Sequence, residues 1–182
     1  MISIESIDYL EFNELNNELL NSYANLYCEI WKEPPWNESF WKPENVLVDL
    51  EQQIIKQDSC ALFSTNSSKD KIVGFTWGYA VNIQELIEMS SGASFEEFIS
   101  KDERVFYIDE LGVEKNHRNL GIGKRLSLIM IDEIRARSFS KVVLRTNMIA
   151  IPARKLYCVL GFTELPVQDL KYTDRTYWLL KL

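Results

Sequence analysis

The sequence is poor in the residues that hold metal ions and disulfides. Of its 182 residues, one is histidine and three are cysteine. The cysteines, Cys28, Cys60 and Cys158, are far apart and form no Cys-x-x-Cys pair, which argues against a disulfide framework or a zinc site and favours a reducing compartment. The single histidine, His117, excludes a multi-histidine metal site. It also excludes Ser-His-Asp and Cys-His catalysis unless His117 itself takes part. We therefore expect no metal.

Long apolar runs and an excess of positive charge are also missing. No apolar run approaches the ~20 residues needed to cross a bilayer, and residues 1–5 lack the basic region and cleavage site of a signal peptide. The net charge of −7 is opposite in sign to the surface that nucleic acids attract. We expect a cytoplasmic protein that binds neither a membrane nor nucleic acid. The negative charge either attracts a cationic substrate or serves solubility alone.

The hydrophobic pattern predicts one domain in which strands and helices alternate. Apolar residues recur at helical spacing over 12–31, 46–55, 121–137 and 150–160. Runs of apolar, β-branched and aromatic residues predict strands at 2–8, 60–63, 72–81, 105–113, 141–146, from residue 162 onward and at 175–180. The polar segment 84–100 forms either a short helix or an insert over a site. This order predicts a mixed α/β sheet, with a parallel crossover between the strands at 105–113 and 141–146.

The segment after the strand at 105–113 carries the clearest chemical signal. The strand leads into a loop with two glycines and then directly into a long helix. The first amides of a helix lack intrahelical acceptors and lie at the positive end of its dipole, so they attract phosphate. Gly121 and Gly123 let an anion approach the backbone, and Arg118 and Lys124 add positive charge. A Walker A loop and a dinucleotide fingerprint are both excluded, because neither residue pattern is complete here.

The residues that remain resemble a known coenzyme-binding signature. Arg118-Asn119-Leu120-Gly121-Ile122-Gly123 is similar to the coenzyme A signature [QR]-x-x-G-x-[GA] of the GCN5-related N-acetyltransferase (GNAT) superfamily. Glu110-Leu111-Gly112-Val113 resembles the end of that family's fourth strand, and 153–162 resembles its A-x-x-L-Y-x-x-x-G-F ending. The resemblance implies a single GNAT domain over 1–182, with an α/β mixed sheet and helices on both faces. Its coenzyme-binding core would span about 72–182, and its acceptor elements about 10–58 and 84–103.

The resemblance also implies where acetyl-CoA binds. The strands at 105–113 and 141–146 should separate and hold the pantetheine arm between them, with the backbone of Leu111 and Val113 bonded to the arm. The amides from Arg118 to Lys124 should take the pyrophosphate. Asn147 either contacts the pantetheine or caps the next helix. The family often has asparagine where this chain has Ala150, which removes one expected contact. The expected coenzyme residues are Leu111, Gly112, Val113, Arg118, Asn119, Leu120, Gly121, Ile122, Gly123, Lys124 and Asn147.

Two side chains are candidates for proton transfer. Tyr157 lies where family members often have a tyrosine that protonates the leaving thiolate, and its other interpretation is a core aromatic. Glu110 is our candidate for the general base that deprotonates an attacking amine, and its other interpretation is a strand-end carboxylate in an ion pair. Strand alternation predicts that Asp109 points to the opposite face. His117 is expected at the surface.

These features together predict an acetyl-CoA-dependent N-acetyltransferase. We expect acetyl-CoA as cosubstrate and a primary amine of a small molecule as acceptor, with direct attack in a ternary complex. A protein or peptide amine is an alternative acceptor, and a non-catalytic coenzyme A-binding module is an alternative function. The residues Trp31, Glu33, Trp36 and Trp41 either recognise a cationic amine or cover the edge of the core. A homodimer through the strand at 175–180 is left open.

Overall fold

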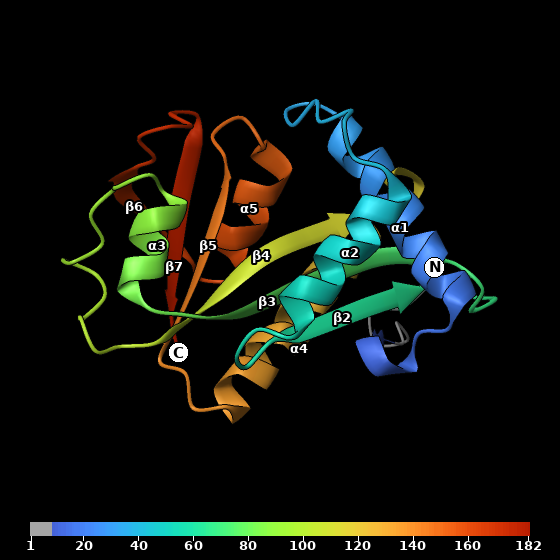
Figure 1. Ribbon diagram of the computed structural model, residues 1–182, viewed down its shortest axis with the longest axis horizontal. Coiled ribbons are helices and arrows are strands. Elements are labelled where there is room, and N and C mark those ends of the chain that lie inside the picture. The colour runs from blue at the N-terminus through green and yellow to red at the C-terminus, as the bar shows by residue number, and fades with distance from the viewer. Residues whose placement is uncertain (1–8) are drawn as a thin grey trace.

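A seven-stranded mixed sheet forms the centre of the molecule, in the order β1-β2-β3-β4-β5-β7-β6 (Figure 1). The computed structural model describes residues 9–182. The strands are β1 (Tyr9–Glu11), β2 (Cys60–Thr65), β3 (Ile72–Val81), β4 (Val105–Val113), β5 (Lys141–Asn147), β6 (Thr163–Gln168) and β7 (Arg175–Lys181). The helices are α1 (Asn17–Lys32), α2 (Pro43–Ile54), α3 (Ile83–Met89), α4 (Ile122–Ala136) and α5 (Ile151–Val159).

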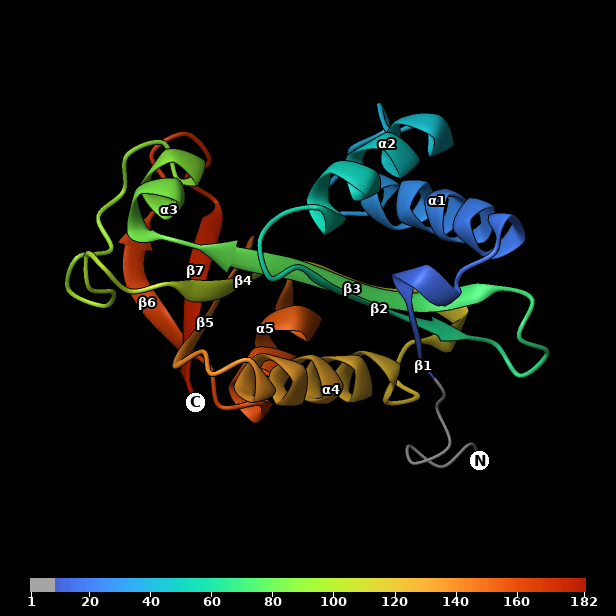
Figure 2. The same ribbon diagram turned by 60° about the horizontal axis from the view of Figure 1, so that its bottom comes forward.

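Helices cover both faces of this sheet, which confirms the predicted fold class. Helices α1 and α2 pack on one face, and α4 lies on the other (Figure 2). Each face has its own apolar core, one centred on Tyr23, Phe63 and Phe75 and the other on Leu126 and Met130. Strand β3 is buried along its whole length because both of its faces are covered. No helix in the described part of the chain is long and apolar enough to span a bilayer.

The two N-terminal helices begin at residues that differ from the predicted ones, for local reasons. Helix α1 begins at Asn17 because Asn16 caps it, its Oδ1 accepting a hydrogen bond from Leu19 N at 2.9 Å. A short 3₁₀ turn occupies 12–14 instead. Helix α2 begins at Pro43, whose fixed φ suits the first helical position. The strand predicted at 2–8 lies outside the described residues.

Strands β4 and β5 pair over only part of their length. They are parallel, as predicted, and three residue pairs join them: Phe106–Val142, Tyr107–Val143 and Ile108–Leu144. Beyond Ile108 the strands separate, while β4 stays paired with β3 as far as Val113. The second half of β4 therefore has one edge without a neighbouring strand. The expected separation of these two strands is confirmed.

A β-bulge interrupts the pairing of β4 with β3 at the same level. Trp77 pairs with Glu110 and Gly78 pairs with Ile108, so Asp109 is an extra residue on β4. The strands approach closely here: a Cβ atom on Gly78 would lie 2.2 Å from the backbone oxygen of Tyr107. A glycine is therefore required opposite the bulge, because backbone atoms cannot move aside as a flexible side chain can.

This contact predicts that Gly78→Ala destabilises the fold. We expect a loss of about 1–3 kcal/mol in the free energy of unfolding, as for other overpacked sites, measured by urea denaturation. Gly123→Ala is the matched control, because a Cβ atom there would lie 3.4 Å from Val113 Cγ2, an ordinary contact. Equal stability of the two variants would contradict the tight approach of β3 to β4.

Candidate active site

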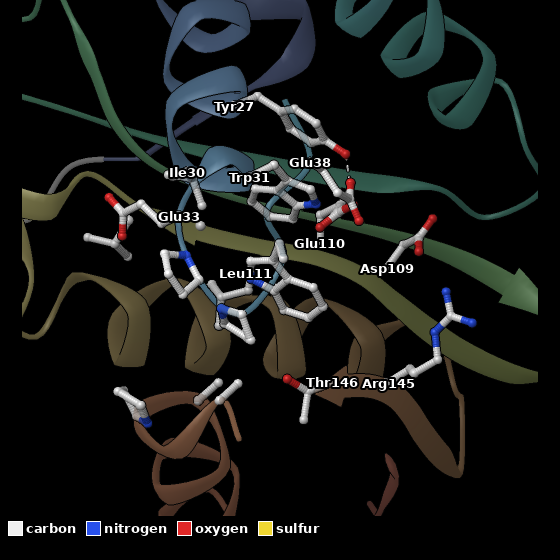
Figure 3. A pocket seen from close by; sticks show the side chains of 18 of the residues that line it. Tyr27, Ile30, Trp31, Glu33, Glu38, Asp109, Glu110, Leu111, Arg145 and Thr146 are labelled. Carbon is white, nitrogen blue, oxygen red and sulfur yellow. Dashed lines mark hydrogen bonds between the residues drawn. The ribbon is translucent and has the colours of Figure 1, made fainter. Parts of the chain in front are cut away.

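The separation of β4 from β5 opens a cavity of about 410 Å³ (Figure 3). Its walls come from both halves of the chain. The second half contributes Tyr107, Asp109–Val113, Arg118, Arg145, Thr146, Ala150, Pro152, Ala153, Tyr157 and Arg175. The first half contributes Tyr27, Ile30, Trp31, Glu33, Pro34, Pro35, Trp36, Glu38 and Trp41. Residues 84–103, which were expected at the acceptor site together with about 10–58, line no part of this cavity, whereas α1 and the loop after it form one of its walls.

Two adjacent carboxylates of β4 face this cavity. Asp109 Oδ2 accepts a hydrogen bond from Tyr79 OH at 2.9 Å, and Glu110 Oε1 accepts one from Tyr27 OH at 3.0 Å. Figure 3 shows both side chains on the α1 side of the sheet. The expectation that Asp109 points to the opposite face is wrong. The bulge supplies one extra residue, so the alternation of faces is broken between Asp109 and Glu110.

Burial makes both carboxyl groups weaker acids by raising their pKa values. Burial raises the pKa of Glu110 well above its usual range, and the charge of Asp109 raises it further against the hydrogen bond from Tyr27. Burial also raises the pKa of Asp109, although the Tyr79 hydrogen bond opposes the shift. A carboxylate with a raised pKa binds a proton more readily near neutral pH, which is a property a general base requires.

A third carboxylate reaches the cavity from the loop after α1. Glu38 Oε2 accepts a hydrogen bond from Trp41 Nε1 at 2.8 Å. Like Asp109 and Glu110, it is held by an uncharged aromatic donor. None of the three forms a salt bridge with any residue of the described range 9–182. The cavity wall therefore carries three carboxyl groups that are held by hydrogen bonds and not by salt bridges.

Tyr157 faces the same cavity from α5. Only 8% of its surface is exposed, and its ring packs against Phe162 and Trp178 with centroids 5.9 and 6.0 Å away. Burial, followed by the charge of Glu110, raises the pKa of its hydroxyl. The hydroxyl is therefore protonated at neutral pH and has no hydrogen-bond partner within the described part of the chain. It is available as a donor.

The glycine-containing loop has the backbone expected of an anion site. Gly121 is the N-cap of α4 with φ of 85°, a left-handed conformation that glycine adopts without strain. The first amide that bonds one turn back is Arg125 N, which donates to Gly121 O at 2.9 Å. The amides of Ile122, Gly123 and Lys124 precede it and stand at the positive end of the helix.

Arg118 has contacts that the sequence did not indicate. Its Nε donates to Val113 O at 3.0 Å and its Nη1 to Glu33 Oε2 at 2.6 Å. The side chain thus connects the loop before α4 with the loop after α1. The neighbouring His117 is partly exposed and contacts the Glu114 carboxylate through its Nδ1, in agreement with the expected surface position.

Asn147 does not reach the cavity. Its Nδ2 donates to Asp174 Oδ2 at 2.5 Å and its Oδ1 accepts from Ile149 N at 3.0 Å. Asn147 therefore fixes the turn before α5, but it does not cap that helix, because the N-cap, Ala150, has no side-chain cap hydrogen bond. We leave Asn147 out of the proposed coenzyme site.

Sequence reasoning missed several lining residues. Tyr27 and Glu38 carry no motif, and Tyr107 and Arg145 lie within strands that read as ordinary core. The one available signal was the tryptophan-rich stretch after α1. That stretch was expected either at the acceptor or at the core edge, and its residues Trp31, Trp36 and Trp41 line the cavity.

Solved structures of similar fold support this view of the architecture. The NatC complex bound to Gag peptide and CoA is 19% identical, with 97% of this chain and 98% of that chain covered and a TM-score of 0.68. The PaiA N-acetyltransferase of Thermoplasma acidophilum in complex with coenzyme A is 15% identical, with coverage of 97% and 99% and a TM-score of 0.69. NAA60 of Arabidopsis thaliana in complex with a bisubstrate analogue is 16% identical, with the same coverage and a TM-score of 0.67.

At these identities the likeness establishes the fold alone. No curated protein sequence matches the chain. The family is established by a separate match, which covers residues 18–162 and includes the loop before α4, the open half of β4 and Tyr157. That match is to the acetyltransferase (GNAT) family, and the protein belongs to it.

Proposed function

We propose that the protein transfers the acetyl group of acetyl-CoA to a primary amine of a small molecule, by direct attack in a ternary complex. The observation that carries this proposal is the cavity between β4 and β5. It brings the free edge of β4, the Glu110 carboxylate and the Tyr157 hydroxyl together. The three free cysteines support a reducing compartment, and we propose the cytoplasm.

The coenzyme would bind along the open half of β4. The pantetheine arm would replace the missing strand beside Leu111, Gly112 and Val113, and bond the backbone groups there. The pyrophosphate would lie at the amides from Arg118 to Lys124, where the N-terminus of α4 attracts anions. To reach Val113 O, the arm must compete with the Arg118 side chain, which occupies that oxygen in the free protein. Coenzyme A or acetyl-CoA in solved structures of this fold supports the assignment.

The reaction requires one base and one acid. Glu110 would take a proton from the attacking ammonium, and its raised pKa suits that role. The amine nitrogen then forms a bond to the thioester carbonyl carbon while the Val113 amide polarises the carbonyl oxygen. When the carbon–sulfur bond breaks, Tyr157 would donate its proton to the leaving thiolate, and the nitrogen would give its second proton back to the tyrosinate, which leaves the amide and the free thiol of coenzyme A. Each group lies on the wall of one cavity, so no rearrangement of the fold is required.

The acceptor would enter from the side of α1 and the loop after it. Trp31, Trp36 and Trp41 offer aromatic faces to a cation there. The Arg175 guanidinium lies 4.9 Å from the Trp36 ring centroid, so the loop after α1 meets β7 beside the cavity. This contact narrows the entrance to the cavity and favours a small molecule as the acceptor. A protein or peptide amine is the alternative, because two of the similar structures are the NatC complex with a peptide and NAA60 with a bisubstrate analogue.

Release of free thiol from acetyl-CoA tests the reaction and its acceptor class together. Amines, aminoglycosides and short peptides would be compared beside calorimetric binding of coenzyme A. We expect turnover with a small amine. Turnover with peptides alone would move the assignment to the alternative acceptor. Tight coenzyme binding without any turnover would favour a non-catalytic coenzyme A-binding module, and no coenzyme binding would refute the proposed site.

Tyr157→Phe tests the acid. We expect kcat to fall roughly 10²- to 10⁴-fold, as for loss of a general acid, with the affinity for coenzyme A retained. The phenylalanine ring keeps the packing against Phe162 and Trp178, so the melting temperature should change little. Unchanged kcat would assign Tyr157 to the core and remove it from the mechanism.

Glu110→Gln tests the base through the pH dependence of the rate. Because the pKa of Glu110 is raised, wild-type kcat/KM should increase with pH through an apparent pKa above the usual 4.5. In the variant this rising limb should disappear, and kcat/KM should fall by roughly 10²-fold or more. Glu38→Gln is the comparison in the same cavity. If both variants keep the wild-type profile, another group or water accepts the proton.

A further inference from the structure

The inner end of the cavity lies where β4 and β5 stop pairing. Ile108 and Leu144 form the last pair, and Asp109 and Arg145, the next residue on each strand, both line the cavity. Tyr107 lines it as well, although only 1% of its surface is exposed. Within residues 9–182 its hydroxyl has no hydrogen-bond partner. A buried hydroxyl of this kind is usually completed by a bound group.

The cations nearest to Asp109, Lys56 and Arg145, oppose the rise of its pKa but form no salt bridge with it. Asp109 uses one oxygen for Tyr79 OH and leaves the other without a partner in the described chain. The Lys56 ammonium lies over the Tyr79 ring, 3.6 Å from its centroid, and forms no salt bridge with Asp109. Asp109 and Glu110 therefore face the cavity side by side, each with a free oxygen.

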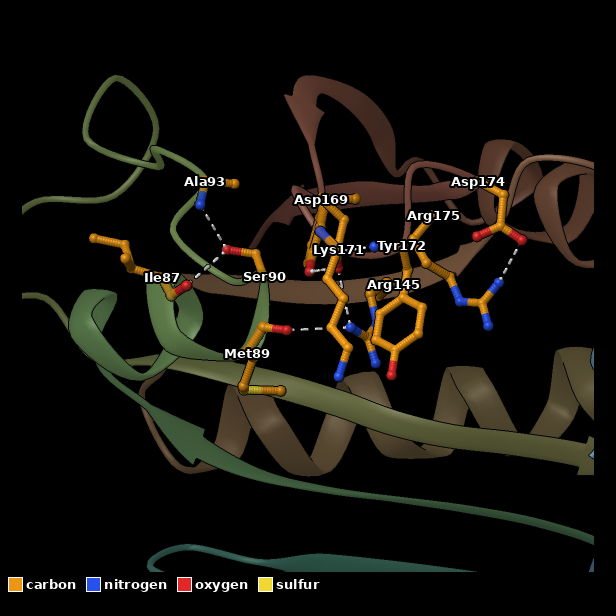
Figure 4. Close-up of polar contacts among 11 residues, drawn as sticks. Ile87, Met89, Ser90, Ala93, Arg145, Asp169, Lys171, Tyr172, Asp174 and Arg175 are labelled. Carbon is orange, nitrogen blue, oxygen red and sulfur yellow. Dashed lines mark hydrogen bonds and ion pairs between the residues drawn. The ribbon is translucent and has the colours of Figure 1, made fainter. Parts of the chain in front are cut away.

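Arg145 is already paired with a carboxylate that does not line the cavity, that of Asp169 (Figure 4). Its Nη1 lies 3.2 Å from Asp169 Oδ2, and Asp169 is completely buried. Asp169 also accepts hydrogen bonds from the amides of Lys171 and Tyr172, at 3.0 and 2.8 Å, and from Tyr177 OH at 3.0 Å. Burial raises the pKa of Asp169, but these bonds outweigh it and hold the pKa below the usual value. Asp169 is therefore charged and offsets Arg145.

The groups left without a partner at this end are carboxyl oxygens and a hydroxyl, which accept hydrogen bonds and favour a cation as ligand. We propose that the acceptor carries a second positive charge, which binds between the Asp109 carboxylate and the Tyr107 hydroxyl while the amine beside Glu110 is acetylated. This inference rests on the proposed acetyl transfer and names its substrate class: a diamine or longer polyamine. An ammonium group donates three hydrogen bonds, and both Asp109 and Tyr107 offer oxygen atoms that accept them. Because Asp109 adjoins Glu110 in sequence, the two nitrogens should be separated by a short carbon chain.

Three acceptors that differ only at the distal end test the subsite. Diaminobutane, butylamine and γ-aminobutyrate share one primary amine and end in an ammonium, a methyl and a carboxylate group. We expect kcat/KM for diaminobutane to exceed that for butylamine by about tenfold or more, as for one charge-assisted hydrogen bond. γ-Aminobutyrate should be the poorest, because its carboxylate would face Asp109.

Asp109→Asn should bring the ratio of kcat/KM for diaminobutane over butylamine towards one. Asp102→Asn is the matched control, because it removes the same charge from an exposed position outside the cavity and should keep the wild-type ratio. Circular dichroism and calorimetric binding of coenzyme A verify that each variant is folded. A ratio near one in the wild type, or a preference for γ-aminobutyrate, would overturn the proposal, the latter by assigning an anion to Arg145.

Calorimetric binding of the three compounds to the coenzyme A complex makes the same comparison without turnover. Tenfold tighter binding of diaminobutane than butylamine supports the subsite even if neither is acetylated, and equal or absent binding refutes it. Failure of the proposed function has a different signature, since coenzyme A itself would then not bind or no amine would be acetylated.

Discussion

The pairing of β4 with β5 stops after Ile108 and Leu144, and the site depends on the gap this leaves. A strand edge inside a protein must find hydrogen-bond partners for its backbone groups. Here the second half of β4 faces a cavity instead of a strand, and an extended substrate arm can supply the missing partners. The same gap admits Tyr157 from α5 to the space beside Glu110. The proposed coenzyme site and the proposed proton transfer therefore share one structural cause.

The bulge at Asp109 gives this gap its electrostatic character. It turns two adjacent carboxylates to one face, where burial raises the pKa of both and the charge of Asp109 raises that of Glu110 further. Hydrogen bonds from Tyr79 and Tyr27 orient the carboxylates without neutralising them. A cationic ligand beside them would favour their charged forms and lower both pKa values. The close approach at Gly78 fixes the bulge in place.

Contacts across the cavity connect the acceptor side with the coenzyme side. Arg118 lies in the loop that resembles a coenzyme A signature, yet its guanidinium bonds Glu33 in the loop after α1. Arg175 of β7 lies over the Trp36 ring of the same loop. The loop after α1 is thus held by groups from both sides of the opening. A ligand that engages Arg118 would change how that loop is held.

The sequence by itself determined the features that depend on neighbouring residues. Periodicity gave β3 and β4 with the bounds found in the structure, and the residues around Arg118–Gly123 predicted the strand, glycine loop and helix that the structure shows. Tertiary structure alone decided which side chains meet. Strand alternation predicted the wrong face of the sheet for Asp109, because a bulge depends on the register with a partner strand about 30 residues away. The side chain of Asn147 donates a hydrogen bond to Asp174 and does not line the cavity. Tyr107, Glu38 and Arg145 line the cavity from separate elements. Such contacts depend on how distant segments pack, and local sequence patterns carry no record of that packing.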